Sequence, residues 1–592
     1  MKKIETQNTH PITFLLNSIG KKRLLHLLVI VFINSILDIV GIALIFPFLQ
    51  IIANPSLLID KANQLNIHIP FSHQNLVLSL GFLLISFYAL KSLAQSKLAK
   101  KQAQYLSRYT GKNTNDIVSK ILQARYSIFQ NTAASEISGT AYSNTVHTSI
   151  ALAALIQSFN EALIIVFLMI GFFWINPVLA VGTIGVLILI SFLLFNFVIK
   201  KSSNLGVAQT HIENIRYRLL FSITTSIRDI KIMGLENLFD KKNQEISKQY
   251  ADLAWRYNHN SALPRFIIEF LALSAVVAVA IITIISQIPG EDATPALGLL
   301  AVATVRAVPA FSRLFNSLSS YKFSSRFVQN LFALEQTLSS ASAPYIKDNL
   351  SFSKSIQLKD ICFSYHKNKI INNISLDIKF GESIAIVGPS GAGKSTLLDI
   401  FTGLQPATSG QFICDDEPFN PYTSESIHNL IGYVPQAITL LDETIAYNIT
   451  FQSAPDLKKL NDVIRKACLE DLIKDIPEGL FTKVGENGLR LSGGQRQRIG
   501  IARALYKMPS ILIFDEATSA LDAVSERLLI DEIASLRGNV SSIMVTHKLS
   551  TAIFCDKIYV LNKGSVVAVG THVELLKACK LYKQMFAIQQ ST

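Results

Sequence analysis

Charged residues are scarce in this chain: aspartate, glutamate, lysine and arginine make up 16% of its 592 residues, whereas hydrophobic residues make up 49%. An ordinary soluble domain has about 25% charged residues, so part of the chain is expected to avoid water. Long apolar runs precede about residue 338, and ordinary mixed sequence follows residue 345. The composition therefore predicts one membrane domain joined to one soluble domain.

Cysteine is also scarce. The five cysteines are Cys362, Cys414, Cys468, Cys555 and Cys579. Their odd number and the absence of a CxxC pair argue against both disulfides and a zinc site.

The first 23 residues lack the apolar core and small-residue cleavage site of a signal peptide. Apolar residues between Ile12 and Ile19 instead predict an N-terminal interfacial helix within residues 1–23.

Six apolar runs approach or exceed the roughly 20 residues that a helix needs to cross the hydrocarbon core. They lie at 24–51, 76–98, 149–174, 177–199, 263–288 and 296–318. A single run of this kind is often a buried core helix, but six in series favour membrane spans. We therefore assign 24–338 to a six-helix transmembrane domain, 339–350 to a linker and 351–592 to a soluble domain.

Lysine and arginine gather after the second and fourth runs, at 97–125 and 200–256, whereas 50–74 contains only Lys61. Basic segments favour the cytoplasmic side, which places both termini there as well. The net charge of +13 could indicate nucleic-acid binding. Because the charge is concentrated at membrane edges, contact with anionic lipid is the better explanation, and we expect no nucleic-acid partner.

A phosphate-binding pattern follows an apolar strand expected at 383–387. It consists of Gly388, Pro389, Ser390, Gly391, Ala392, Gly393, Lys394, Ser395 and Thr396. In this Walker A loop the glycines let backbone N–H groups surround the phosphates. Lys394 reaches the β- and γ-phosphates, and the hydroxyl of Ser395 holds Mg²⁺. A helix is expected to begin here, and its N-terminus stabilises phosphate charge.

A second motif lies about a hundred residues later and consists of Leu491, Ser492, Gly493, Gly494 and Gln495. Together the two motifs resemble the ATP-binding cassette of ABC transporters, which implies ATP and Mg²⁺ as cofactors. The second motif opens an expected helix at 494–506, whose free N–H groups form another anion site. In the family two cassettes meet head to tail, so the resemblance implies a dimer. Because one chain supplies every motif, we expect a homodimer.

The resemblance also assigns the catalytic chemistry. A strand expected at 511–515 ends in Asp515, which should support Mg²⁺ directly or through water. Glu516 follows it and should act as the general base that polarises the attacking water. This order of an apolar strand and two carboxylates is the Walker B pattern.

Three further residues match cassette positions. Tyr365 matches the aromatic residue on which the family stacks adenine, with a core tyrosine as the alternative. Gln436 matches the Q-loop glutamine beside Mg²⁺ and the γ-phosphate, and His547 matches the switch histidine. Residues 519–522 match the D-loop.

Two cytoplasmic intervals, 96–123 and 202–222, are too long to be turns. Continued as helices at about 1.5 Å per residue, they would extend tens of ångströms from the membrane. This arrangement resembles the type I ABC exporter fold, also called the type IV transporter fold: an all-α six-helix membrane domain followed by an α/β P-loop ATPase domain. The resemblance implies coupling helices, which we expect at 126–137 and 224–235. A solvated charged turn is the alternative for the second.

Polar residues in membrane spans are candidates for the substrate path. These are Asn34 and Asp38 on the first expected helix, Arg265 and Glu269 on the fifth, and Arg306 and Arg313 on the sixth. Arg265 and Glu269 have the spacing of an intrahelical ion pair. Arg306 and Arg313 have no acidic neighbour at helical spacing, so they predict a cationic stripe that suits a phosphate or pyrophosphate headgroup. Contact with lipid phosphate or with a neighbouring helix is the alternative.

Residues 37–48 and 263–269 resemble bacterial lipid-linked oligosaccharide flippases of the PglK type. The resemblance implies ATP-driven movement of a lipid-linked saccharide, or another anionic amphipathic lipid, across the bacterial inner membrane to its outer side. A multidrug or lipid exporter with an apolar cavity is the first alternative. A peptide exporter and a regulatory ATPase or gate are the others.

Overall fold

The computed structural model describes residues 11–53, 73–175, 194–285, 290–340, 345–365, 368–517 and 523–590. The chain divides into two compact units. The first unit is Met1–Ala124 with Ile128–Ser342, and the second is Arg125–Ser127 with Ala343–Thr592. The division after Ser342 falls inside the interval 339–350 that the sequence predicts as a linker.

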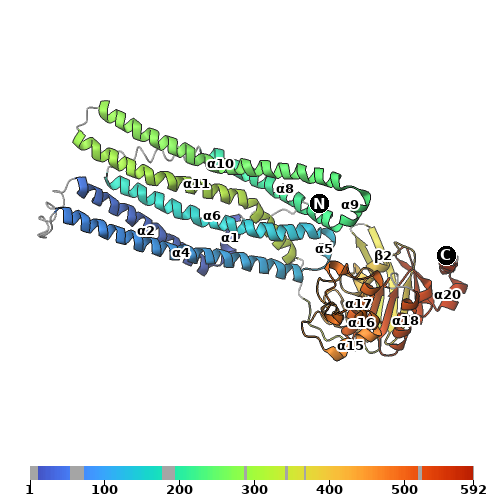
Figure 1. Ribbon diagram of the computed structural model, residues 1–592. Coiled ribbons are helices and arrows are strands. Elements are labelled where there is room, and N and C mark those ends of the chain that lie inside the picture. Colours follow the sequence, from blue (N-terminus) through green and yellow to red (C-terminus); the bar gives the residue numbers. More distant parts are fainter. Residues whose placement is uncertain are drawn as a thin grey trace. The chain divides into compact units, whose positions relative to one another are not determined.

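The described part of the first unit is helical, and its long helices run side by side (Figure 1). The helices are α1 (Pro11–Ile19), α2 (Lys21–Ala53), α4 (His73–Gln123), α5 (Ser127–Asn131), α6 (Ala134–Ile175), the π-helical turn η1 (Phe195–Ile199), α8 (Lys200–Thr225), α9 (Ile227–Met233), α10 (Glu236–Ile285) and α11 (Gly290–Ser340).

Four stretches of these helices are long and apolar enough to cross a membrane: Lys21–Gly41, Val77–Gln123, Ala134–Gly171 and Glu236–Ala278. They overlap four of the six spans predicted from the sequence. The predicted span at 177–199 lies mostly outside the described residues. The span predicted at 296–318 lies within α11, where the side chains up to 306 are not described.

Two short helices lie in the intervals predicted for coupling helices. α5 falls within 126–137 and α9 within 224–235, and each separates two long helices. α9 ends at Gly234, whose φ of 64° is a left-handed conformation that glycine adopts with little strain. The chain therefore turns sharply at these points, whereas the docking role of the short helices stays a prediction.

Apolar and small side chains pack the helices of this unit together. Ile165, Ile268 and Phe311 bring α6, α10 and α11 into one buried cluster. α8 approaches α11 closely at Gly206, where a Cβ atom would lie 2.1 Å from the carbonyl oxygen of Phe323. Glycine at this position therefore lets the two helix backbones meet.

The second unit is α/β. Its strands are β1 (Ser355–Tyr365), β2 (Asn368–Lys379), β3 (Ser383–Val387), β4 (Ser409–Cys414), β5 (Glu417–Phe419), β6 (Ile431–Val434), β7 (Ile511–Asp515), β8 (Ser541–Val545), β9 (Lys557–Asn562) and β10 (Ser565–Gly570). Its helices are α12 (Lys394–Phe401), α13 (Ile427–Leu430), α14 (Ile445–Thr450), α15 (Leu457–Lys466), α16 (Glu470–Asp475), η2 (Gly479–Phe481), η3 (Glu486–Gly488), α17 (Gly493–Tyr506), α18 (Ala523–Ser535), α19 (Leu549–Ala552), α20 (His572–Ala578) and α21 (Lys580–Gln590).

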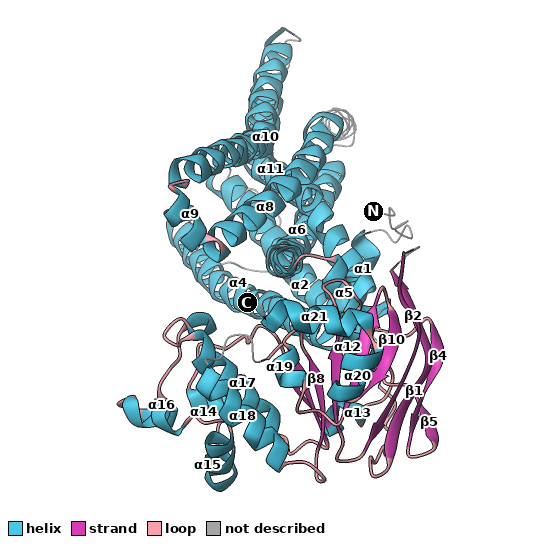
Figure 2. Cartoon of the chain, turned by 90° about the vertical axis from the view of Figure 1, so that its right-hand side faces the viewer, coloured by secondary structure: helices cyan, strands magenta, loops and turns pink. Residues whose placement is uncertain are grey.

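Two sheets organise this unit. One is antiparallel, in the order β2-β1-β4-β5, and the other has the order β10-β9-β3-β8-β7-β6. Figure 2 shows helices α14 to α18 on one side of the unit and the antiparallel sheet on the other. In the larger sheet β3, β6, β7, β8 and β9 run parallel, so their carboxyl ends lie along one edge. This is the edge where open α/β sheets bind ligands.

The close approach at Gly206 gives a stability prediction. Gly206→Ala should lower the thermal unfolding midpoint, because the added methyl group must push α8 away from α11, and such overpacking costs about 1–3 kcal/mol. Gly111→Ala on α4 is the matched control, since no atom outside its own stretch of helix lies within 4 Å of the place that a Cβ would take. Scanning fluorimetry of the purified variants compares them. Equal midpoints for the two variants would contradict the proposed helix contact.

Candidate functional site

The predicted phosphate-binding loop connects β3 to α12. Gly391 and Gly393 have φ values of 77° and 99°, which glycine reaches at little cost. A Cβ atom at Gly388 would lie 2.2 Å from the carbonyl oxygen of Leu561, so this position excludes a side chain. The other predicted contacts occupy the same loop and the first turn of α12: Ser390, Ala392, Ser395 and Thr396. The loop geometry therefore fits a nucleotide phosphate chain.

Lys394 begins α12 and is 8% exposed. Its ammonium donates to the carbonyl oxygens of Gly388 at 2.9 Å and Pro389 at 3.1 Å. Burial lowers the pKa of Lys394, while the negative charges of Glu516 and Asp515 oppose this shift. The ammonium is thus held beside the loop where phosphates are expected.

Asp515 ends β7, next to the same edge of the sheet. Its Oδ2 accepts a hydrogen bond of 3.0 Å from the hydroxyl of Tyr433 on β6. Burial raises the pKa of Asp515, and this hydrogen bond opposes the shift. The carboxylate of Asp515 and the hydroxyl of Ser395 are oxygen ligands of the kind that suits Mg²⁺. Tyr433 is not among the sequence candidates, because its partner Asp515 lies 82 positions away in the sequence.

The three residues predicted as catalytic meet at Glu516. One carboxylate oxygen lies 3.2 Å from Nδ1 of His547, and the other accepts a hydrogen bond of 2.7 Å from Nε2 of Gln436. Glu516 has a φ of 50°, which is unfavourable for a residue with a side chain. Its backbone N–H donates to the carbonyl oxygen of Val545 at 2.8 Å, and this bond helps to hold the conformation.

The second predicted anion site begins α17. Ser492 is the N-cap, and its hydroxyl accepts from the backbone N–H of Gln495 while the Gln495 side chain accepts from the N–H of Ser492. Gly493 and Gly494 form the first turn of the helix. This capping box fixes the start of α17, one residue earlier than the sequence predicts.

Tyr365 lies at the end of β1, and 39% of its surface is exposed. Its ring packs edge-to-face against Phe363, with a centroid distance of 4.7 Å. This partial exposure is compatible with stacking on adenine as well as with packing. The predicted D-loop lies almost wholly outside the described residues, because the structure describes 368–517 and 523–590 there.

The helix α21 contacts the loop that carries His547, which sequence reasoning missed. The Gln589 side chain donates to the carbonyl oxygen of His547 and accepts a hydrogen bond of 2.7 Å from the N–H of Leu549. Tyr582 anchors α21 and is fully buried. Gln589 therefore holds the backbone on both sides of Lys548.

A second candidate site is a cavity of about 440 Å³ between α10 and α11 in the first unit. Arg265, Glu269, Ser312 and Arg313 line it together with apolar side chains such as Leu273. The intrahelical ion pair that the spacing of Arg265 and Glu269 permits is not formed: among the described residues, neither side chain has an ion pair. The structure thus brings three of the substrate-path candidates, Arg265, Glu269 and Arg313, to one cavity.

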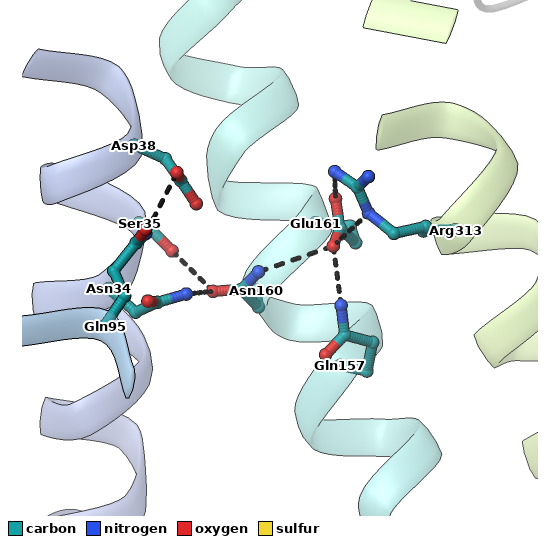
Figure 3. Close-up of polar contacts among 8 residues, drawn as sticks. All are labelled: Asn34, Ser35, Asp38, Gln95, Gln157, Asn160, Glu161 and Arg313. Carbon is teal, nitrogen blue, oxygen red and sulfur yellow. Dashed lines mark hydrogen bonds and ion pairs between the residues drawn. The ribbon is translucent and has the colours of Figure 1, made fainter. Parts of the chain in front are cut away.

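Arg313 follows the alternative given for the cationic stripe, contact with a neighbouring helix. Its guanidinium donates to both carboxylate oxygens of Glu161 on α6, at 2.8 Å and 3.0 Å (Figure 3). The Glu161 side chain is 2% exposed, whereas that of Arg313 is 53% exposed. Spacing within one helix does not reveal this partner, because Glu161 lies on another helix, 152 positions away in the sequence. Arg306 is in α11, but its side chain is outside the described part of the chain.

Asn34 and Asp38 make contacts between helices and do not line this cavity. Asn34 donates to Asn160 on α6 at 3.2 Å. Asp38 accepts a hydrogen bond of 3.0 Å from Gln95 and forms an ion pair of 2.9 Å with Lys91, both on α4 (Figure 3 shows the contact with Gln95). In this structure both residues therefore connect helices.

The contacts of Gln589 give a kinetic prediction. Gln589→Glu removes the N–H that donates to the His547 carbonyl and places negative charge beside it. We expect kcat for ATP hydrolysis to fall about tenfold, because small displacements of catalytic groups are costly. KM for ATP should change less than about twofold, since the phosphate loop is untouched.

Gln590→Glu introduces the same charge at the next, exposed position of α21 and serves as the control. Steady-state phosphate release at varied ATP concentration provides both parameters. The assigned role of Gln589 is rejected if the two variants have the same kcat.

Comparisons with known proteins agree with this geometry. Residues 371–519 match the model of the ABC transporter family. An ATP-dependent lipid A-core flippase of Idiomarina loihiensis is 33% identical over 335 residues, which cover 56% of this chain and 57% of the relative. A putative multidrug export ATP-binding/permease protein of Bacillus subtilis, YgaD, is 40% identical over 238 residues, which cover 40% of this chain and 41% of that protein. The chain thus spans less than two thirds of the length of these relatives.

The structure of a bacterial Atm1-family ABC exporter with ATP bound is similar over 97% of this chain and 99% of that chain, with a TM-score of 0.79 and 21% identity. This likeness confirms the fold class predicted from the sequence, a helical membrane domain followed by an α/β ATPase domain. Together the comparisons show a match to the ABC transporter family within the second unit, at residues 371–519, in a chain that has the fold of this exporter.

Proposed function

We propose that the chain hydrolyses ATP to move an amphipathic substrate, a lipid-linked saccharide or another anionic lipid, from the cytoplasmic to the outer side of a bacterial inner membrane. The observation that carries the proposal is the convergence of Gln436 and His547 on Glu516 in a chain whose other unit contains a charged cavity. The first feature supplies hydrolysis, and the second supplies a place for a headgroup.

Each residue of the nucleotide site has a chemical task. Lys394 and the N–H groups at the start of α12 hold the phosphates, and Glu516 accepts a proton from the attacking water. Gln436 and His547 orient the Glu516 carboxylate through the contacts described above. Mg²⁺, held by Asp515 and Ser395 with help from Gln436, would neutralise charge on the phosphates.

Transport requires that nucleotide binding favour one membrane conformation. Two copies of the chain would close around ATP, with Ser492 of one copy capping the phosphate bound by the other. ATP shifts the equilibrium only through its higher affinity for the closed state. The short helices α5 and α9 are the elements that we propose carry this change to the long helices.

The cavity favours a substrate that has both a polar and an apolar part. Arg265 and Arg313 offer N–H groups to a phosphate, and Leu273 and Val308 offer an apolar wall. Relatives named as lipid A-core flippases support a lipid substrate. The relative named for multidrug export supports the second candidate, an exporter of apolar compounds.

The catalytic assignment makes a first prediction. Glu516→Gln should bind ATP with near-normal affinity but hydrolyse it at least about a hundredfold more slowly, because general-base assistance contributes 10²–10⁴. Lys394→Ala is the contrasting variant and should weaken ATP binding itself. Equilibrium binding and phosphate release distinguish the two effects. Near-normal turnover by Glu516→Gln would show that another group is the base.

The substrate assignment makes a second prediction. Arg265→Gln should reduce movement of a lipid-linked saccharide at least about tenfold, because a charge-assisted hydrogen bond to the phosphate is lost. Hydrolysis should change less than about twofold, since the nucleotide site is untouched. Protection of the labelled saccharide from an external modifying reagent measures movement in proteoliposomes.

Arg326→Gln removes an exposed arginine of the same unit, on α11, and is the control. Arg313→Lys tests the other cation while keeping a positive charge beside Glu161, and it should be tolerated partly because lysine lacks the planar fork. Full movement of the saccharide by Arg265→Gln would favour the exporter of apolar compounds.

A further inference from the structure

The cavity between α10 and α11 contains a carboxylate as well as arginines. Glu269 lies one helical turn after Arg265 on α10, and both side chains are exposed and line the cavity. Neither forms a hydrogen bond or an ion pair with another residue that the structure describes. Free charges are costly at membrane depth, so each is expected to meet a complementary group.

The charges of the described residues at this cavity balance. Arg313 is neutralised by Glu161, whose carboxylate accepts two hydrogen bonds from the guanidinium. The remaining pair, Arg265 and Glu269, has one charge of each sign. A headgroup that carries only negative charges would therefore lie against the Glu269 carboxylate. The two like charges would repel each other, and this repulsion is strong where the dielectric constant is low.

The cavity also offers a hydroxyl. Ser312 lines it, and the Ser312 Oγ atom is buried without a hydrogen-bond partner among the described residues. A buried polar atom in this state costs free energy that a ligand hydrogen bond would recover. The cavity thus presents donors at Arg265, an acceptor at Glu269 and a hydroxyl that serves as either.

We propose that Glu269 determines headgroup specificity by accepting hydrogen bonds from hydroxyl or ammonium groups next to the phosphate. An ionised carboxylate only accepts hydrogen bonds, so it favours a ligand with donor groups and disfavours a bare phosphate. The inference rests on the proposed function, which supplies the phosphate at Arg265. It narrows the substrate class to lipids whose headgroup combines an anion with adjacent donors.

A binding experiment on the purified full chain tests this. Native mass spectrometry measures affinity for phosphatidic acid, phosphatidylglycerol and phosphatidylethanolamine with identical acyl chains. The first has a phosphate without a further headgroup, the second adds hydroxyls and the third adds an ammonium. We expect the chain to bind at least one of the latter two about tenfold more tightly than phosphatidic acid, since charge-assisted hydrogen bonds are gained. The two lipids distinguish a hydroxyl from an ammonium as the donor.

Glu269→Gln should reduce this preference to about twofold or less, because the charged acceptor is gone. Glu245→Gln removes an exposed carboxylate elsewhere on α10 and should keep the preference. The proposal is overturned if Glu269→Gln keeps the preference, or if Glu245→Gln loses it as well. It is also overturned if the unmodified chain binds the three lipids equally or binds none of them.

The binding measurement needs neither ATP nor transport, so its failure is distinguishable from failure of the proposed function. A chain that shows the Glu269-dependent preference but moves no lipid would keep the specificity assignment and reject export. A chain that moves lipid without the preference would reject the specificity assignment alone.

Discussion

The ion pair between Glu161 and Arg313 constrains how α6 and α11 pack together, and the polar contacts between the neighbouring helices adjoin it. The Glu161 carboxylate is 2% exposed on a helix long and apolar enough to cross a membrane, so it requires a partner. Burying a charge without a partner costs a free energy on the order of several kcal/mol. The pair therefore fixes α6 against α11. It also leaves part of the Arg313 guanidinium exposed, since 53% of that side chain remains accessible.

Polar contacts extend from this pair to α2, and a further ion pair joins α2 to α4. Asn160 donates to Glu161 at 3.5 Å and accepts from Asn34 on α2 (Figure 3). Asp38, one turn further along α2, pairs with Lys91 on α4. A Cβ atom at Gly41 would lie 2.8 Å from Nζ of Lys91, so glycine at that position leaves space for the ammonium group. These contacts link α11, α6, α2 and α4, and they give the buried side chains of Glu161, Asn160 and Lys91 partners on neighbouring helices.

The nucleotide site was largely predictable because its signals are local. The Walker A loop and Glu516 each follow a short apolar strand, and parallel strands bring such segments to one edge of a sheet. The contacts of Tyr433 and Gln589 were not predictable in this way. Tyr433 acts through a residue 82 positions away and Gln589 through one 42 positions away, so no local spacing reveals them.

Four of the predicted spans and the positions of the two short helices agree with the described residues, whereas the polar contacts between helices were less predictable. The partner of Arg313 is 152 positions away in the sequence, and a search along one helix could not find it. Likewise, the spacing of Arg265 and Glu269 permits an ion pair, but spacing alone does not decide whether the side chains turn toward each other or toward the cavity.

The most direct test of the central claim is simultaneous measurement of ATP hydrolysis and lipid movement by the unmodified chain in sealed proteoliposomes. If the chain is a pump, labelled lipid should move to the opposite leaflet at a rate proportional to hydrolysis, and movement should stop when a non-hydrolysable ATP analogue replaces ATP. If the analogue alone supports continued movement down a gradient, the chain is a nucleotide-controlled gate, and the account of ATP-driven export is wrong.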